Sequence, residues 1–248
     1  MTWETVAAWE ASAKNVLRIL EAHLADHDFI LGGRPSVADY GLLGPLYAHL
    51  WQDPVPGAMI KRDYPRVEQW ARRCHGGEPG TTNGGEWLAD DAVPDTVIPL
   101  LQVFFTEMWP VLRSTCAVLR RYRETIHPSA DIPVPSKSFS PSHPDQTGTG
   151  PLVHGFSLPF GADGRRGGVS TGRRMVVPYQ VWMLQRLEPT VHHGGPSVAA
   201  LLARFEGAAT LSALGKDLAG CRLRKIGGRM HWDLDDASDQ ATGKQKRS

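Results

Sequence analysis

The segment DFILGGRPSVADYGLLGPLYAHLW, which runs from Asp28 to Trp51, decides the fold. Gly32 and Gly33 predict a turn, because a residue without a Cβ tolerates the left-handed backbone that closes a helix. Ser36 and Asp39 have the spacing of a capping box, in which the serine hydroxyl accepts from the Asp39 N–H and the Asp39 carboxylate accepts from the Ser36 N–H. A helix is therefore predicted to begin at Ser36.

Apolar side chains then follow one face of this helix: Tyr40, Leu43, Tyr47, Leu50 and Trp51. Gly44-Pro45 predicts a kink, since proline removes a backbone donor, and the Pro- and Gly-rich residues 53–57 predict the end of the helix. The aromatic residues Tyr40, Tyr47 and Trp51 have two interpretations. They line a pocket for an acceptor substrate, or they are core, and core is the commoner fate of such a stripe.

Three more helical stretches surround this segment. Residues 2–25 carry apolar side chains at three- and four-residue steps, and Tyr64-Pro65 opens a short helix to Cys74. Residues 94–122 form the longest helical pattern, which Pro99 and Pro110 are expected to bend or divide. The fold class is therefore predicted to be mainly α.

The C-terminal half has a different composition. Residues 127–151 are rich in Pro and Ser and predict a disordered linker, and residues 233–248 predict a disordered tail. Between them, 154–160 and 174–179 are expected to pair as strands around a Gly- and Arg-rich turn, with helices at 179–187 and 197–205. The predicted organisation is a helical domain at 1–126, the linker at 127–151, a small hairpin-plus-helix extension at 152–232, and the tail.

Charge and cysteine content exclude several classes of protein. The 27 Lys and Arg nearly balance the 26 Asp and Glu, so neither nucleic acid nor a membrane is expected as a partner. No stretch approaches the ~20 apolar residues that span a bilayer, and the first ten residues do not resemble a signal peptide. The three cysteines are far apart and lack a C-x-x-C arrangement, which favours a reducing, cytoplasmic setting.

Other polar groups give weaker signals. His192-His193 lacks the spacing of a metal site, and Asp233, Asp235 and Asp236 lack the glycine and glutamate of a calcium loop, so no metal ligand is predicted. The arginine pairs at 165–166 and 173–174 flank glycines and either clamp a phosphate or lie on an exposed turn. The exposed turn is favoured, because the glycines match no phosphate-binding motif.

Two motifs carry a family resemblance. The run from Phe29 to Tyr40, an apolar pair, a glycine turn and Ser-x-x-Asp, resembles the hallmark of the C-terminal helical domain of glutathione transferases. Tyr64-Pro65-x-Val67-x-x-Trp70 is similar to the helix that follows it in that family. The resemblance implies a helical bundle in which Ser36 and Asp39 are structural residues. A catalytic Ser–Asp pair is disfavoured, because no histidine lies nearby in sequence to act as base.

In that family a separate thioredoxin-like domain before the helices binds and ionises glutathione. Only 35 residues precede Ser36 here, so that domain is expected to be missing, together with the first helix of the helical domain. The resemblance thus implies no catalytic residue and no cofactor bound by this chain alone, with glutathione as co-substrate of the full-length family. A homodimer or a thioredoxin-like partner domain is expected.

Two functions follow. The chain is a truncated transferase that contributes to glutathione conjugation or reduction when the missing half is supplied, or it is a non-catalytic helical interaction module.

Overall fold

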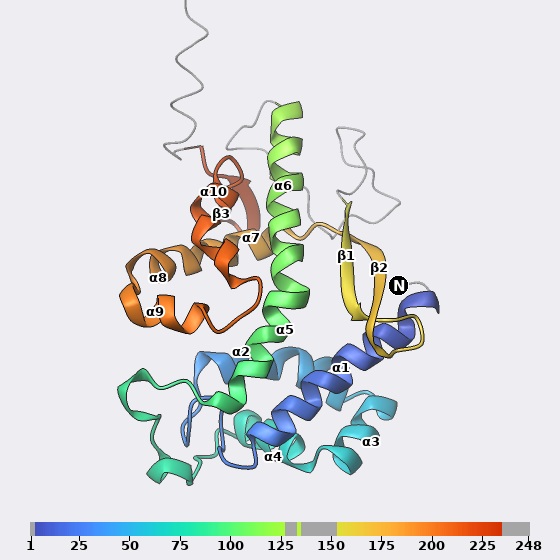
Figure 1. Ribbon diagram of the computed structural model, residues 1–248, viewed down its shortest axis with the longest axis vertical. Helices are drawn as coiled ribbons and strands as arrows, with labels where there is room; N and C mark the ends of the chain where they lie inside the picture. The colour runs from blue at the N-terminus through green and yellow to red at the C-terminus, as the bar shows by residue number, and fades with distance from the viewer. Residues whose placement is uncertain (1–2, 127–132, 135–152, 235–248) are drawn as a thin grey trace, which may run out of the picture. The chain divides into compact units, whose positions relative to one another are not determined.

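Helices dominate the computed structural model, which describes residues 3–126, 133–134 and 153–234 (Figure 1). These residues form two units. One unit runs from Ala7 to Val103, and the second joins residues 3–6 to the described residues from Phe104 onward. The predicted mainly α fold class is confirmed. The predicted linker and tail lie outside the described residues, except for 133–134 and 233–234.

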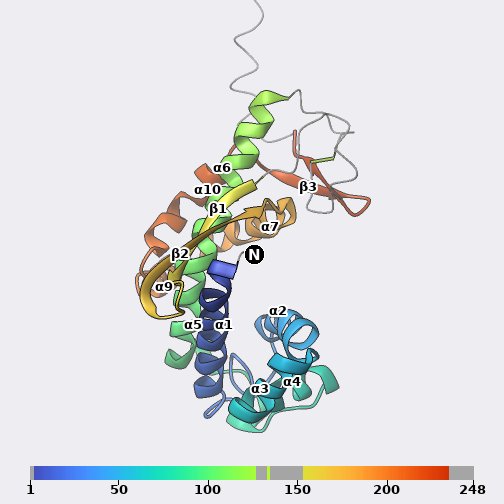
Figure 2. The same ribbon diagram turned by 90° about the vertical axis from the view of Figure 1, so that its right-hand side faces the viewer.

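The unit from Ala7 to Val103 packs its helices around fully buried Trp70. Figure 2 shows α2, α3 and α4 gathered together. Leucines of α1 and the apolar residues around Phe29 complete its core. Its helices are α1 (Trp3–His23), α2 (Val37–Pro45), α3 (Pro54–Asp63), α4 (Pro65–Gly76) and α5 (Ile98–Val103), with the short turns η1 (Leu46–Trp51), η2 (Thr82–Gly85), η3 (Ala89–Asp91) and η4 (Asp95–Val97).

The prolines of this unit explain where its helices begin and bend. At Gly44-Pro45, where a kink was predicted, the α-helix changes type: α2 ends at Pro45 and continues as η1, a turn of π-helix. Helix α3 is a correction, because residues 53–57 were expected only to end a helix. Pro54 instead begins one, since a first-turn residue has no intrahelical use for its N–H. Gly57 permits the sharp passage from η1, because a Cβ there would lie 2.3 Å from the Trp51 carbonyl oxygen.

The second unit is built along α6 (Trp109–Thr125), which contacts an antiparallel hairpin and the helices α7 and α10 (Figure 1). The division predicted at the prolines is confirmed, since η5 (Phe104–Met108) separates α5 from α6. The remaining elements are β1 (Val153–Phe160), β2 (Arg166–Met175), α7 (Pro178–Leu184), η6 (Gln185–Leu187), α8 (Glu188–His193), α9 (Gly195–Leu202), η7 (Ala208–Ala213), α10 (Leu214–Leu218), β3 (Leu223–Ile226) and β4 (Arg229–Trp232).

The second strand of the hairpin was predicted in the wrong place. Arg166–Met175, which includes most of the expected Gly- and Arg-rich turn, is itself β2 and pairs with β1 so that His154 lies opposite Arg174. The glycines suit this strand, because a Cβ at Gly172 would lie 2.6 Å from Cζ of Phe156. The second hairpin, β3–β4, was not predicted, although Gly227-Gly228, both with positive φ, is a favoured hairpin turn.

Candidate functional site

The first candidate site is a buried carboxylate, that of Asp39 in the first turn of α2. Its side chain is fully buried. Oδ2 accepts from the N–H and from the hydroxyl of Ser36, both at 2.8 Å, and Oδ1 accepts from the N–H of Ile30 at 2.9 Å. The structure thus places Ser36 directly before α2 and brings it together with Asp39 in a capping box.

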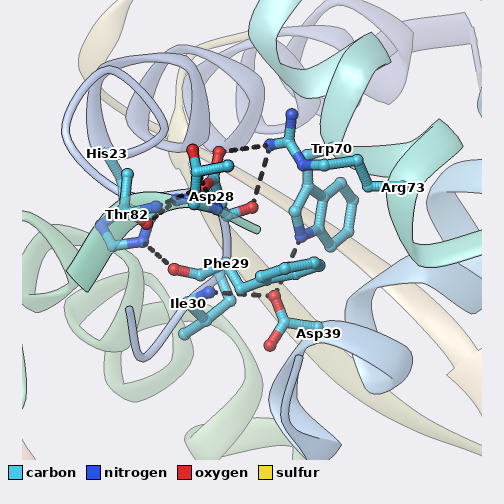
Figure 3. Close-up of polar contacts among 9 residues, drawn as sticks. His23, Asp28, Phe29, Ile30, Asp39, Trp70, Arg73 and Thr82 are labelled. Atoms are coloured by element: carbon cyan, nitrogen blue, oxygen red, sulfur yellow. Dashed lines mark hydrogen bonds and ion pairs between the residues drawn. The ribbon is translucent and has the colours of Figure 1, made fainter. Parts of the chain in front are cut away.

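Asp39 also ties α2 to a distant helix. The indole Nε1 of Trp70 in α4 donates to Asp39 Oδ1 at 2.9 Å, as Figure 3 shows. Each carboxylate oxygen therefore accepts two hydrogen bonds, which offsets the cost of removing its charge from water. The sequence did not reveal this role of Trp70, although Trp70 belongs to the quoted family motif. The arrangement stabilises the fold and leaves no free oxygen for chemistry.

A second carboxylate, Asp28, holds the loop after α4. Its Oδ2 accepts from the N–H groups of Thr81 at 2.6 Å and Thr82 at 2.8 Å, and Arg73 lies 3.6 Å from Oδ1 (Figure 3). Partial burial raises the pKa of Asp28, but the two N–H groups and the charge of Arg73 outweigh it, so the pKa lies below its ordinary value. Asp28 is therefore a fixed anion that fastens the 81–82 loop.

His23, at the end of α1, completes this network as a neutral ring. Burial is the largest cause that lowers its pKa from 6.5, and it outweighs the hydrogen bond to the Phe29 carbonyl. Because a carbonyl only accepts, Nε2 donates to Phe29 O at 3.1 Å, and Nδ1 accepts from the Thr96 hydroxyl at 2.8 Å. His23 thus has both nitrogens occupied and does not serve as a free base.

The opposite side of α2 and η1 is apolar and exposed. We call it the α2 face, and its exposed residues are Val37, Ala38, Tyr40, Gly41, Gly44, Pro45 and Ala48. Val37 is 90% exposed and Tyr40 is 52% exposed. From Val37 to Ala48 the chain has one charged side chain, Asp39, and that side chain is buried on the other side. The α2 face is therefore an uncharged, solvent-exposed helix face.

Tyr47 and Trp51, the other predicted pocket-lining residues, are half-buried and form a cluster with His75, and Trp51 also packs against the hydrophobic core. The ring centroid of Tyr47 is 5.0 Å from Trp51 and 4.4 Å from His75, and the Tyr47 hydroxyl is 3.2 Å from His75 Nε2. Trp51 Nε1 is buried and has no hydrogen-bond partner among the described residues. Trp51 Nε1 is therefore an enclosed donor without an acceptor in this part of the chain.

Two cationic side chains lie near the indole ring of Trp51. The Arg72 guanidinium lies 5.2 Å from the Trp51 ring centroid and the Lys61 ammonium 5.8 Å, both within reach of a cation–π interaction. Sequence reasoning did not identify His75, Arg72 or Lys61. Lys61 lies on α3 and Arg72 and His75 lie on α4, so they come near the tryptophan only when those helices pack against η1.

Residues 3–126, 133–134 and 153–234 contain no group of three or more His, Cys, Asp or Glu that can hold a metal ion. None of the helices within these ranges is both long and apolar enough to cross a membrane.

The comparisons with known proteins give one match. The sequence of residues 4–73, from the start of α1 to the last turn of α4, matches the family described as Glutathione S-transferase, C-terminal domain. No curated protein and no solved structure matches the chain.

Proposed function

Because residues 4–73 are a glutathione S-transferase C-terminal domain, we propose that this chain supplies the electrophile side of a glutathione-dependent enzyme. In this proposal a thioredoxin-like domain packs on the α2 face and brings glutathione. That domain belongs to a partner or to a longer form of this chain. The conclusion depends on one observation, the uncharged and exposed α2 face.

The geometry of the α2 face supports such a docked domain. Gly41 and Gly44 have open space where a Cβ would stand, so another backbone can approach this helix closely. Tyr40 stands at this face, where its ring becomes a wall of the space between the two domains. Hydrophobic burial over such a face is the usual driving force for association of domains.

The chemistry divides between the two parts. A glutathione thiol reacts as its thiolate, so an enzyme must lower the thiol pKa with a donated hydrogen bond and hold the sulfur against the electrophile. We assign that task to the docked domain. Strands in the described residues form two antiparallel hairpins, β1–β2 and β3–β4, and both follow α6. The helical domain contributes the apolar wall that orients an electrophile and excludes water.

A fusion protein tests this proposal. The thioredoxin-like domain of a bacterial glutathione transferase is placed before Met1, and formation of the thioether from glutathione and 1-chloro-2,4-dinitrobenzene is measured. In this reaction the thiolate forms a C–S bond and chloride leaves. We expect the fusion to exceed the summed rates of the two separate parts, because the electrophile is then held beside the sulfur.

Two matched substitutions locate the contact. Gly44→Glu places a charge on the α2 face and should abolish the gain, because an unpaired charge would be buried at the contact. Val55→Glu is the control, since Val55 is an equally apolar residue, 82% exposed, on α3 outside that face. A fusion that gains nothing, or a gain that survives Gly44→Glu, would contradict the proposal.

The alternative is a non-catalytic interaction module, which the same exposed face also favours. It predicts a fusion with no added rate while the isolated chain still associates through the α2 face. Sedimentation of the chain with and without Gly44→Glu separates the two functions, because a self-associating module loses its association in the variant.

A further inference from the structure

Two buried thiols lie together in the second unit, Cys116 of α6 and Cys221 in the segment after α10. Cys116 is 1% exposed and Cys221 is 0% exposed. Helix α10 contacts α6 (Figure 1), and the thiols form a hydrogen bond with each other. The fold therefore brings together two cysteines that are 105 positions apart in the sequence.

Arg120 of α6 holds the segment that contains Cys221. Its Nε donates to the Ala219 carbonyl oxygen at 2.9 Å, and its Nη2 donates to the Asp217 carbonyl oxygen at 2.7 Å. Cys221 Sγ lies 3.3 Å from the same Asp217 oxygen. Arg120 and Cys116 are four positions apart on α6, so their side chains lie on one face of that helix. These contacts place Cys221 beside that face of α6, independently of the hydrogen bond between the thiols.

The two thiols differ in acidity. The hydrogen bond from Cys116 is the largest cause that lowers the pKa of Cys221 below its ordinary value, and the charges of Arg120 and Arg222 lower it further, while burial opposes them. The same hydrogen bond, followed by burial, raises the pKa of Cys116. Because the thiolate is the form that attacks a disulfide, Cys221 is the attacking thiol of the pair and Cys116 is the thiol beside it.

We propose that Cys116 and Cys221 are a redox-modification site, at which a low-molecular-weight disulfide oxidises the two thiols to a reversible disulfide bond. The Cys221 thiolate attacks one sulfur of the oxidant, forms a mixed disulfide and displaces one thiolate, which takes up the proton that Cys221 lost. The Cys116 thiolate then attacks Cys221 Sγ, forms the Cys116–Cys221 bond and displaces the second thiolate, which takes up the proton of Cys116. Two protein thiols are oxidised, and the oxidant is reduced to two thiols.

Burial of the pair determines when the exchange occurs and what it does. Since neither thiol is exposed, the oxidant reaches Cys221 only when the segment after α10 opens. After the segment closes, the bond would join it covalently to α6 and restrict the unfolded chain, which stabilises the second unit. The site lies wholly in the second unit and is independent of the proposed transferase function.

Equilibration of the full chain with mixtures of reduced glutathione and glutathione disulfide tests the proposal. After acid quenching, free thiols are blocked with N-ethylmaleimide in denaturant, and the protein is analysed by mass spectrometry. The oxidised form should have one blocked thiol, that of Cys74, and trypsin should release residues 114–120 linked to residues 217–222. The absence of this cross-link at every glutathione ratio would overturn the proposal, as would a cross-link to Cys74 or glutathione adducts that persist at both positions.

Unfolding and matched variants show whether the fold brings the thiols together. In urea-unfolded protein, the same degree of oxidation should require at least tenfold more glutathione disulfide at a fixed glutathione concentration, because the chain no longer holds the thiols side by side. Cys74→Ser is the control and should oxidise like the unaltered protein, whereas Cys221→Ser should form no intramolecular cross-link. Equal oxidation of the folded and unfolded chains, or loss of the cross-link in Cys74→Ser, would contradict the proposal.

Discussion

At the scale of the residue, Asp39 is a fully buried side chain whose carboxylate accepts four hydrogen bonds within the first unit. Asp39→Ala leaves the N–H groups of Ile30 and Ser36 and the Trp70 indole without an acceptor in a dry interior. We expect this change to cost about 3–5 kcal/mol of unfolding free energy, and Ser36→Ala about 1 kcal/mol. Urea unfolding followed by circular dichroism measures both. Asp53→Ala is the control, because Asp53 precedes α3 without a side-chain capping bond, and a loss there as large as at Asp39 would refute the assignment.

His23 makes stability depend on pH. Its folded-state pKa lies below 6.5, so between that lowered value and about 6.5 the unfolded chain binds more protons than the folded one. The stabilisation is therefore complete above about pH 6.5 and is lost as the pH falls toward the lowered pKa. When the pH is lowered from about 7 to 5, the unfolding free energy of His23→Gln should fall less than that of the unaltered protein, as measured by urea unfolding. In His49→Gln, a change at an exposed position, the unfolding free energy should depend on pH as it does in the unaltered protein. The same pH dependence in all three proteins would disprove the role of His23.

The sequence predicted some of these residues and not others. Ser36 and Asp39 could be paired from their spacing, because a capping box is local in the chain. Trp70 Nε1 and the Ile30 N–H could not be assigned to Asp39, because their approach depends on how α4 and the loop before α2 fold over it. The same limit applies to His154 and Arg174, which lie 20 residues apart and became neighbours only through the register of the hairpin.

At the scale of the element, α4 is capped by another helix. Tyr64 precedes α4 without a side-chain capping bond, and Glu21 of α1 supplies the acceptor instead. Its Oε2 accepts from the N–H groups of Arg66 at 3.0 Å and Val67 at 3.1 Å. A carboxylate at this end also interacts favourably with the helix dipole.

Substitutions distinguish this cap from a surface ion pair. Glu21→Ala should cost about 1–2 kcal/mol of unfolding free energy, because two N–H groups lose their acceptor. Arg66→Ala should cost less than about 0.5 kcal/mol, since the Arg66–Glu21 ion pair has an exposed arginine. Urea midpoints compare the two. Equal losses would mean that the ion pair, rather than the cap, is what stabilises the start of α4.

Helix existence was more predictable than helix boundaries or strands. Apolar periodicity identified α1, α2, α4 and α6, because their buried faces repeat every turn. Helix α3 was missed because two prolines resemble a terminator whether a helix ends before them or begins at them. Strand β2 was missed because its glycines carry no periodic signal, and what they permit, the position of the Phe156 ring, appears only in the paired structure.

At the scale of the whole molecule, buried thiols report separately on the two units. Cys74 lies in the first unit, where burial and then Asp39 raise its pKa to about 12. Cys116 and Cys221 lie in the second unit, are buried, and hydrogen bond to each other, which raises the pKa of Cys116 further than burial alone. Alkylation of each thiol therefore requires opening of its own unit.

Alkylation rates can therefore test whether the two units open independently of each other. Asp39→Ala should accelerate alkylation of Cys74 by iodoacetamide at least tenfold, since it destabilises the first unit, while Cys116 and Cys221 react within twofold of the original rate. Peptide mapping by mass spectrometry resolves the three sites. Equal acceleration at all three would show that the units open together.

The limits of the units were harder to predict than their contents. The chain passes from one unit to the other at Val103–Phe104, between the two prolines that were expected to divide the long helical stretch. Both sides of that point are helical, so no loop or change of composition marks it. The domain limits drawn at residues 126, 151 and 232 remain a prediction.

The start of α4 depends on the carboxylate of Glu21 in α1. The first turn of α4 depends on an acceptor from a residue 45 positions earlier in the chain. In a peptide that contains α4 alone, these N–H groups would bind water instead, and the helix would fray at its N-terminus. Any excised or transplanted version of this helix must bring α1 with it.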